Sequence, residues 1–429
     1  MSAVRVEPAG ALVGHIAVPG DKSVSHRALL IGALCDGVTR VRGFGASGDT
    51  LATLGVVRAL GVEVEHDEDE LTVHGVGLRG LRAPDDTLDC GNAGTSMRLL
   101  IGILAGQSGT FELTGDESLS RRPMERVAEP IRRMSGRVET TDGHAPVTIT
   151  GSDALHGIEY ALPVASAQVK SAILLAGLNA DGATTVIEPA QTRDHTELML
   201  EAAGARVRRR PASVTVEPAG RLQLDEVVVP GDVSAAAPFI VAATLLPGSE
   251  LTIHDLGLNP RRTGLLDVLE RMGARLSVFN RRKVAGEWVG DLEVRASELT
   301  GTRVTADEVP RLVDELPLFA LVAGLARGES RVDGAAELRV KETDRIESVT
   351  DALRPLGVRI RASDDGFTVR GVPSRPNGGR MTAAGDHRIA MVGAVAGLVS
   401  REGVDVRDAE AAAISFPGFF DLLESVSRR

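Results

Sequence analysis

The segment from Glu337 to Ile346 holds the residues of this chain best suited to chemistry. Seven of its ten residues, in the order Glu-Leu-Arg-Val-Lys-Glu-Thr-Asp-Arg-Ile, carry a charge or a hydroxyl group. We predict that they follow a turn at Asp333-Gly334 and open a helix from Glu342 to Leu356. A helix N-terminus attracts anions, because its free N–H groups and the helix dipole favour negative charge. A solvated helix face is the alternative interpretation.

Three other compact clusters combine glycine with basic or phosphate-binding residues. They are Gly20-Asp21-Lys22-Ser23-Val24-Ser25-His26-Arg27, Gly91-Asn92-Ala93-Gly94-Thr95 and Gly385-Asp386-His387-Arg388. Four such clusters at equivalent turns predict a site that holds more than one phosphate. The first cluster is not a nucleotide-binding P-loop, because no glycine precedes Lys22 at the required interval and Asp21 stands where that motif has glycine.

Composition limits the possible functions. The chain has 429 residues, of which 43% are hydrophobic and 25% charged, as in a soluble globular protein of several domains. Its net charge of −11 argues against nucleic-acid binding. Only Cys35 and Cys90 are present, without metal-ligand spacing, so we expect no structural metal. We find neither a signal-like start nor 18 consecutive apolar residues, and we therefore expect a cytoplasmic protein with no membrane partner.

A repeated pattern organises the whole chain. A short strand-like run, a polar turn and an apolar helix recur six times, with starts 67 to 77 residues apart. The runs begin near Ile16, Leu88, Tyr160, Val227, Val304 and Arg380. An amphipathic second helix follows in most repeats, predicted at residues 51–60, 124–134, 196–203, 263–272 and 344–356. Gly61, Gly136, Gly204, Gly273 and Gly357 come next and suit the left-handed position after a helix. The unit is therefore β-α-β-α-β-β.

The first helix of each unit is apolar on all sides and should be buried, with its N-terminus at the edge of the core. Six units divide into two domains of three. The crossings fall at the matching segments Val18-Pro19-Gly20-Asp21 and Val229-Pro230-Gly231-Asp232. We therefore predict one domain at residues 20–231 and a discontinuous second domain at residues 1–19 and 232–429. The sequence predicts an α/β fold.

These motifs resemble those of the 5-enolpyruvylshikimate-3-phosphate synthase family, within the enolpyruvyl transferase superfamily. The resemblance covers essentially the whole chain. It is carried, in order, by PGDKSVSHRAL, GNAGTSMRLL, SLSRRPM, ASAQVKSA, the VDELPL segment around Asp314, ELRVKETDRI and GDHRIAM. It implies a two-domain inverse α/β barrel of six repeats, three per domain. The implied reaction joins phosphoenolpyruvate to shikimate 3-phosphate, releases phosphate, and needs no metal or organic cofactor.

The resemblance also implies roles for particular residues. Lys22, Ser23 and Arg27 contact the two substrates. The residues around phosphoenolpyruvate are Lys22, Asn92, Gly94, Arg122, Arg345 and Arg388. Shikimate 3-phosphate is held by Ser166, the backbone of Ala167, and Gln168, with Arg193 close by. Asp314 and Lys341 engage the sugar-acid ring, and Glu342 lies at the reacting carbons. The same family implies inhibition by glyphosate, which occupies the phosphoenolpyruvate pocket.

The expected chemistry fits these residue types. Arginine forks match the phosphates and carboxylates of both substrates. The attacking 5-hydroxyl must lose a proton and the methylene carbon must gain one, so the site needs a base and an acid. The resemblance assigns the base to Asp314 and leaves Glu342 and Lys22 as candidate acids. We expect the partners to be these two small molecules, and the protein to be a monomer.

One position departs from the family pattern. Many members carry lysine before the Ser/Thr-Phe-Pro segment near the C-terminus, where it reaches phosphoenolpyruvate. Here Ile414 precedes Ser415-Phe416-Pro417. That contact is therefore lost or supplied by another base.

Two further functions stay open at this point. The sister enzyme that uses UDP-N-acetylglucosamine has asparagine after the first lysine and usually a loop cysteine, whereas Ser23 follows Lys22 here and residues 112–120 lack cysteine. A non-catalytic phosphate-binding module would need the arginines but not Asp314 or Glu342.

Individual residues also have simpler interpretations. Lys22 and Arg27 could be exposed charges at a helix start. Asp314 could be an acid in a helix N-terminal turn, and Ser166 and Gln168 could be helix caps.

Overall fold

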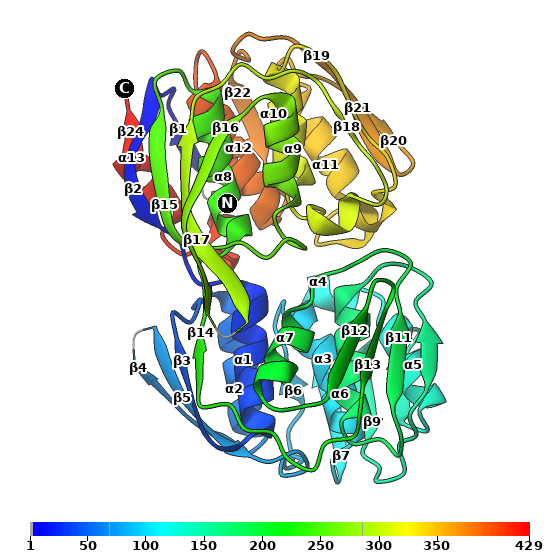
Figure 1. The fold of residues 1–429 in the computed structure, drawn as a ribbon. Coiled ribbons are helices and arrows are strands. Elements are labelled where there is room, and N and C mark those ends of the chain that lie inside the picture. The colour runs from blue at the N-terminus through cyan, green and yellow to red at the C-terminus, as the bar shows by residue number, and fades with distance from the viewer. Residues whose placement is uncertain (1–2, 68, 285) are drawn as a thin grey trace. The chain divides into compact units, whose positions relative to one another are not determined.

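In the part of the chain that the structure describes, six small sheets and six buried helices recur in the order of the predicted repeat (Figure 1). The computed structural model describes residues 3–67, 69–284 and 286–429. The buried helices are α1 (Lys22–Leu34), α3 (Gly94–Ala105), α6 (Ala167–Gly177), α8 (Val233–Leu245), α10 (Leu316–Leu325) and α12 (His387–Val399). Their residues are almost all buried, as expected for helices that are apolar on every side.

Two units make up the chain, each with its own apolar core. We call them the N-terminal unit, Gly20–Val229 with Lys283–Glu287, and the C-terminal unit, Met1–Pro19, Pro230–Arg282 and Trp288–Arg429. In the N-terminal unit α3 packs along α6 and contacts α1. In the C-terminal unit α8, α10 and α12 contact one another. The buried helices thus form the interior of each unit.

Three sheets cover the helices of the N-terminal unit. Their strands, in spatial order, are β14 (Glu226–Val228), β3 (Asp36–Arg42), β5 (Glu70–Val76) and β4 (Glu63–Asp67); β6 (Leu88–Asp89), β7 (Thr110–Thr114), β9 (His144–Thr150) and β8 (Arg137–Thr141); and β10 (Glu159–Ala161), β11 (Thr184–Ile187), β13 (Ser213–Val216) and β12 (Val207–Arg210). In each sheet the first pair is parallel and the other two pairs are antiparallel.

The sheets of the C-terminal unit follow the same plan. Their strands are β16 (Arg275–Val284), β17 (Glu287–Arg295), β15 (Glu250–Gly257), β2 (Ala11–Ala17) and β24 (Ser427–Arg428); β18 (Arg303–Val304), β19 (Gly328–Val332), β21 (Gly366–Gly371) and β20 (Arg359–Ser363); and β1 (Ala3–Val6), β23 (Val404–Arg407) and β22 (Gly379–Thr382). Each of these sheets contains a parallel pair of neighbouring strands, β15–β2, β18–β19 and β22–β23. The fold is therefore mixed α/β, and within the described residues no sheet closes on itself as a barrel.

The second helices lie close to their predicted ranges. They are α2 (Gly48–Ala59), α5 (Glu125–Arg133), α7 (His195–Ala202), α9 (Gly264–Met272) and α11 (Arg345–Leu353). The last repeat has α13 (Phe419–Val426), for which no range was predicted. Short helical turns are α4 (Glu117–Ser120), η1 (Val309–Arg311), η2 (Ala336–Val340) and η3 (Ala409–Ile414). Four of the five predicted glycines have a positive φ, but Gly136 does not, because Ser135 at φ 67° takes the left-handed position there.

The sequence predicts two starts for the helix after η2, at Glu342 and at residue 344, and the start at Glu342 is wrong. The chain forms the short turn η2, then an irregular stretch, and α11 begins only at Arg345. Asp344 caps this helix, because its side chain accepts hydrogen bonds from the backbone N–H groups of Ile346 and Glu347. Glu342 therefore lies in a connection rather than inside the first helical turn.

Gly20 lies in a close backbone approach inside the N-terminal unit. A Cβ atom added there would lie 1.9 Å from the backbone oxygen of Gly43 and 3.0 Å from the backbone nitrogen of Gly45. We expect Gly20→Ala to lower the free energy of unfolding by about 1–3 kcal/mol, the usual cost of forced overpacking. Denaturant unfolding measures this. Gly220→Ala is the control, because a Cβ there meets nothing within 4 Å; equal stability of the two variants would contradict the expectation.

Candidate active site

The start of α1 places Lys22 beside a carboxylate. Asp21 caps the helix by accepting a hydrogen bond from the backbone N–H of Val24 at 2.9 Å. Lys22 follows directly, with 23% of its side chain exposed, and its Nζ lies 2.6 Å from Oδ2 of Asp49. An amino group held by one carboxylate and partly open to solvent can bind an anion or transfer a proton.

Arg27 lies one turn further along α1 and is buried. Its guanidinium donates hydrogen bonds to Oγ1 of Thr196 at 2.7 Å and to Oγ of Ser171 at 3.0 Å. A third bond goes to the backbone oxygen of Ser23 at 2.9 Å. Burial lowers the pKa of Arg27 to about 10, although the charge of Glu197 opposes this shift. The guanidinium therefore stays charged at neutral pH.

The glycine-rich turn before α3 brings Asn92, Gly94 and Arg122 together. Nη2 of Arg122 donates to Oδ1 of Asn92 at 2.8 Å, and Nδ2 of Asn92 donates to Oδ2 of Asp116 at 2.7 Å. Gly94 is the first residue of α3, and a Cβ there would lie 3.2 Å from Nη1 of Arg122. The backbone therefore approaches this guanidinium closely.

The start of α6 connects to α3 through side chains. Ser166 caps α6, because its Oγ accepts a hydrogen bond from the backbone N–H of Val169. Oε1 of Gln168 accepts a hydrogen bond from Arg98 at 2.6 Å, and its Nε2 donates to Oγ1 of Thr95 at 2.9 Å. Arg98 lies one helical turn after Gly94. The glycine-rich turn before α3 and the start of α6 therefore belong to one hydrogen-bond network.

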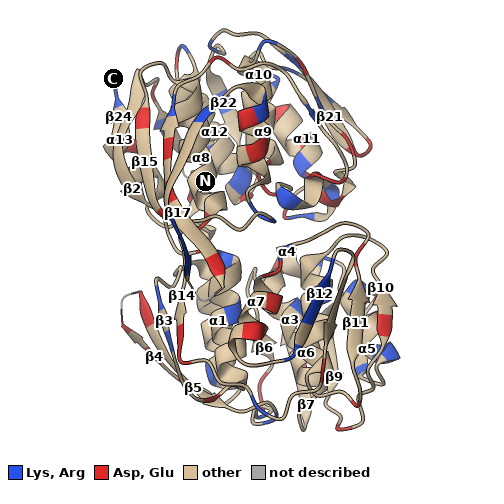
Figure 2. Ribbon diagram, in the orientation of Figure 1, with Lys and Arg blue, Asp and Glu red and all other residues tan. Residues whose placement is uncertain are grey.

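Two further predicted residues lie in the same unit. Ala167 is the first residue of α6, where backbone N–H groups have no partner within the helix. Arg193 is half-buried in the connection before α7. Its charge contributes to lowering the pKa of Arg27, after the larger effect of burial. In Figure 2, α1 carries basic residues and α7, which contacts it, carries acidic ones.

The C-terminal unit gathers the other predicted residues around Arg345. This buried guanidinium lies 2.5 Å from Oε2 of Glu342 and 3.4 Å from Oδ1 of Asp314. Nζ of Lys341 lies 3.8 Å from the same Asp314 oxygen. Burial lowers the pKa of Lys341, with Asp314 opposing the shift. Asp314, which precedes α10, is thus surrounded by positive charge.

Asp386, the N-cap of α12, holds the other side of Arg345. Nε and Nη2 of Arg345 contact its two carboxylate oxygens at 2.8 and 3.2 Å. Burial alone would raise the pKa of Asp386, but the guanidinium outweighs it and holds that pKa below its usual range. Oδ1 also accepts from the backbone N–H of Arg388 at 2.9 Å. This bidentate pair fixes the direction of Arg345.

Sequence reasoning missed a second buried arginine in this unit. Nη2 of Arg262 donates to Oδ1 of Asp232 at 3.0 Å and to Oγ of Ser234 at 2.8 Å. Its Nη1 lies 3.7 Å from Oδ2 of Asp314. Ser234 also donates to the buried Glu315, and Arg388 donates to the backbone oxygen of Ser234. No motif marks Arg262, although Asp232 repeats the Pro-Gly-Asp pattern before α1.

The structure rejects the interpretation of Lys22 and Arg27 as exposed charges and supports the interpretation of Ser166 as a helix cap. Lys22 and Arg27 are not exposed charges, because Arg27 is buried and Lys22 is paired. The capping interpretation of Ser166 is correct, and a cap can still present its hydroxyl to a ligand. Ile414 ends η3, is half-buried and packs against the core of its unit. It offers no polar group to an anion.

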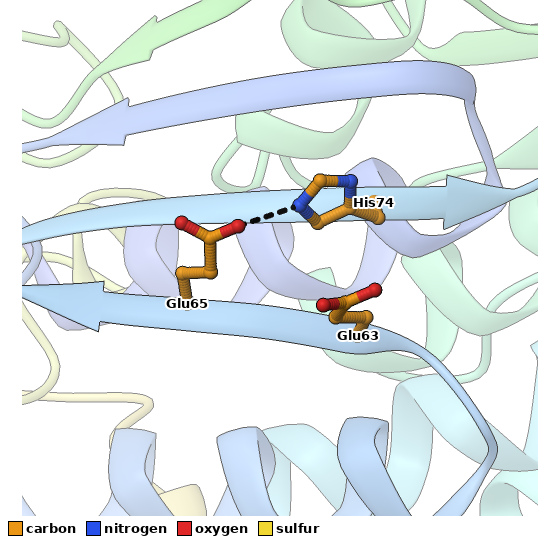
Figure 3. Close-up of side chains that lie close together, drawn as sticks. All are labelled: Glu63, Glu65 and His74. Atoms are coloured by element: carbon orange, nitrogen blue, oxygen red, sulfur yellow. Dashed lines mark hydrogen bonds and ion pairs between the residues drawn. The ribbon is translucent and has the colours of Figure 1, made fainter.

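One group of carboxylate and imidazole side chains within the described residues is close enough to hold a metal ion. Glu63 and Glu65 on β4 and His74 on β5 have ligand atoms within 4.8 Å of one another (Figure 3). His74 is hydrogen-bonded to Glu65 at 3.1 Å, and the two glutamates are exposed. None of the predicted site residues belongs to this group. Exposed carboxylates are commonly solvated without a metal.

The length and apolar character of the helices bear on whether the chain could span a membrane. Of the helices that the structure describes, none has the length and apolar character needed to cross a bilayer.

Buried arginines fixed by carboxylates, with helix N-termini beside several of them, define a protein that binds small molecules with several anionic groups. Comparison with known proteins is more specific. The family model described as EPSP synthase (3-phosphoshikimate 1-carboxyvinyltransferase) matches residues 6–423. The chain belongs to this family.

Individual relatives agree over nearly their full length. The chain is 51% identical, over 97% of its length and 94% of the relative's, to a protein of Alkalilimnicola ehrlichii named 3-phosphoshikimate 1-carboxyvinyltransferase. A protein of the same name from Citrifermentans bemidjiense is 50% identical over the whole of both chains.

Solved structures show the same fold. The structure of EPSP synthase from Acinetobacter baumannii matches with a TM-score of 0.88 and 43% identity, covering 99% of this chain and 98% of that one. The enolpyruvyl transferase NikO from Streptomyces tendae matches with a TM-score of 0.78, covering 98% and 96%. At 20% identity, this second match supports the fold alone.

Proposed function

We propose that this chain transfers the enolpyruvyl (1-carboxyvinyl) group of phosphoenolpyruvate to the 5-hydroxyl of shikimate 3-phosphate. The products are 5-enolpyruvylshikimate 3-phosphate and inorganic phosphate, in the route to chorismate and the aromatic amino acids. Membership of the EPSP synthase family supports the reaction. The observation that carries the site is the cluster of Asp314, Lys341 and Glu342 around buried Arg345.

Phosphoenolpyruvate carries one phosphate and one carboxylate, and the proposed site offers arginines for both. In the N-terminal unit, Arg122 is held by Asn92 beside the bare backbone of Gly94. In the C-terminal unit, Asp386 orients Arg345. Arg388 lies in the first turn of α12, two residues after Asp386, and supplies a second guanidinium group. Such fixed guanidinium groups lose little freedom on binding an anion, which favours tight binding.

Shikimate 3-phosphate is assigned to the starts of α1 and α6. Ser166, the backbone of Ala167, and Gln168 supply hydrogen-bond donors at one helix N-terminus, where phosphate is stabilised. Ser23, Arg27 and Arg193 supply further donors and positive charge. The reaction involves one molecule of each substrate.

The proposed mechanism is addition followed by elimination. Asp314 accepts the proton of the 5-hydroxyl group while the oxygen of that hydroxyl attacks C2 of phosphoenolpyruvate. Glu342 or Lys22 gives a proton to C3, which completes a tetrahedral intermediate. Loss of a proton from C3 then restores the double bond as phosphate leaves from C2. The proton taken from C3 returns to the group that donated it, and the phosphate leaves with the proton from the base.

Positive charge surrounds Asp314, the proposed general base. Lys341 and Arg345 lie within 4 Å of its carboxylate oxygens, together with Arg262. The same cations then stabilise negative charge that builds up on the reacting oxygen atoms.

We expect phosphate release to require both substrates and no added metal ion, because arginine and lysine side chains supply the positive charge. The assay mixes purified protein with phosphoenolpyruvate and shikimate 3-phosphate, with and without a chelator. Activity abolished by the chelator and restored by one divalent ion would refute this expectation.

Replacing shikimate 3-phosphate with UDP-N-acetylglucosamine in the same assay tests the sister reaction. The proposal expects no phosphate release from that mixture. A non-catalytic phosphate-binding module would release no phosphate from either mixture. A monomeric state and a cytoplasmic location stay predictions from the sequence.

A further inference from the structure

Three fully or almost fully buried charged residues lie behind the proposed shikimate 3-phosphate site. Lys170 of α6 has no exposed side chain, and its Nζ lies 3.0 Å from Oε1 of Glu188 and 2.7 Å from Oε1 of Glu197. The side chains of the two glutamates are 3% and 0% exposed. We call these three residues the Lys170 cluster. None of them is among the residues assigned above to substrate.

The Lys170 cluster connects three segments that carry proposed substrate contacts. Lys170 lies one turn after Ser166 in α6, and its backbone N–H donates to the Ser166 oxygen at 3.1 Å. Glu188 follows β11 and accepts hydrogen bonds from the backbone and hydroxyl of Thr192, immediately before Arg193. Glu197 belongs to α7. The cluster therefore joins the α6 start to the segment that leads to Arg193.

The residues next to the cluster hold Arg27. Ser171 follows Lys170, and Thr196 precedes Glu197. Their hydroxyl oxygens lie 2.7 Å apart, and each accepts a hydrogen bond from Arg27. A shift between α6 and α7 would therefore move both acceptors and change the direction of this guanidinium.

Stability alone gives a weak reason for burying three charges. Removing charged groups from water is costly, and apolar residues of similar volume often stabilise a core as well or better. Burial raises the pKa of Glu197, while Lys170 opposes that shift. A fixed geometry is a second role that buried ion pairs can have, because they tolerate only a narrow range of distances.

We propose that the Lys170 cluster is a positioning device for shikimate 3-phosphate. It fixes the start of α6, the approach to Arg193 and the guanidinium of Arg27 in the arrangement that the ligand needs. Lys170 is completely buried and acts through these groups, so it is a positioning residue rather than a catalytic one. The inference rests on the shikimate 3-phosphate site proposed above.

The main test is Lys170→Met, which keeps an unbranched side chain and removes the charge. We expect the dissociation constant for shikimate 3-phosphate, measured by calorimetry, to rise by about 10- to 100-fold, which is ~1.4 to 2.7 kcal/mol of binding free energy. The KM for phosphoenolpyruvate, measured at saturating shikimate 3-phosphate, should change much less. A folded Lys170→Met protein with an unchanged dissociation constant would overturn the proposal, even if its melting temperature fell.

A milder variant decides the question if Lys170→Met fails to fold. Glu197→Gln keeps the side-chain size and leaves Lys170 paired with Glu188. It should raise the same dissociation constant by several-fold, and no change would overturn the proposal. Glu201→Gln is the matched control, because it removes an ion pair with Arg209 at the surface of the same helix. An equal loss of affinity in this control would also overturn it.

One more variant separates failure of this inference from failure of the proposed site. Gln168→Ala removes a group assigned to shikimate 3-phosphate itself. If it binds the ligand as well as the unmodified protein, the assignment of Gln168 is wrong. If it binds weakly while Lys170→Met binds normally, the site stands and only the positioning role is rejected.

Discussion

Asp314→Asn is expected to lower kcat by at least ~10²-fold, the usual scale for losing a general base. The amide keeps the shape of the side chain but cannot accept the proton of the 5-hydroxyl. Binding of shikimate 3-phosphate should stay largely intact, because the arginines and helix N-termini proposed to hold its phosphate are unchanged. Steady-state kinetics and calorimetry on the same preparation measure both quantities.

Asp351→Asn is the matched control for this prediction. Asp351 is exposed on α11 in the same unit, six residues after Arg345. Its amide variant removes one negative charge, as Asp314→Asn does, but from a position that is not proposed to take part in the reaction. Its kcat should be normal. A near-normal kcat in Asp314→Asn would remove Asp314 from the mechanism, whereas equal losses in both variants would indicate a nonspecific effect of charge.

Gly94→Ala should weaken glyphosate inhibition strongly and raise the KM for phosphoenolpyruvate more modestly. The added Cβ would lie 3.0 Å from Nη1 of Arg98 and 3.2 Å from Nη1 of Arg122. It would therefore intrude beside the guanidinium of Arg122, which is proposed to bind phosphoenolpyruvate. A steric cost of 1–3 kcal/mol corresponds to about 5- to 150-fold in affinity. Glyphosate is slightly longer than phosphoenolpyruvate and should therefore bear more of this cost.

Backbone strain gives a different expectation for the same variant. Gly94 is absent from the glycines with positive φ, so alanine fits its backbone without that strain. The melting temperature should therefore change little, as in the control Gly55→Ala, where a Cβ on α2 meets nothing within 4 Å. Equal losses for inhibitor and substrate, together with a lowered melting temperature, would contradict the pocket interpretation of Gly94.

The repeated fold was predictable because its signals are local. A helix that is apolar on every side, such as residues 172–177 within α6, has to be buried, and a glycine after five of the second helices marks the helix end. These features recur in the sequence at a nearly constant spacing, and the order of helices and sheets in the structure confirms the predicted repeat. The start of α11 was misplaced because two acids, Glu342 and Asp344, both suit a helix start. Only the hydrogen bonds identify Asp344 as the cap.

The supporting residues of the candidate site could not be predicted from local patterns. Asp49 pairs with Lys22 from 27 positions away, and Arg262 approaches Asp314 from a separate segment. Nothing in the sequence around Arg262 distinguishes this buried residue from arginines that are exposed to solvent. The Lys170 cluster was missed for the same reason, since Lys170 lies within an apolar helix and meets Glu188 and Glu197 only after folding.

The most direct test of the proposed function is a phosphorus NMR experiment on the purified protein with both substrates. We expect the signals of phosphoenolpyruvate and shikimate 3-phosphate to fall together. Inorganic phosphate and a new signal from shikimate 3-phosphate that carries the enolpyruvyl group as an ether should appear in equal amounts, and neither substrate should react alone. Phosphate released from phosphoenolpyruvate without shikimate 3-phosphate, or no new signal of the enolpyruvyl ether in the complete mixture, would contradict the proposed transfer.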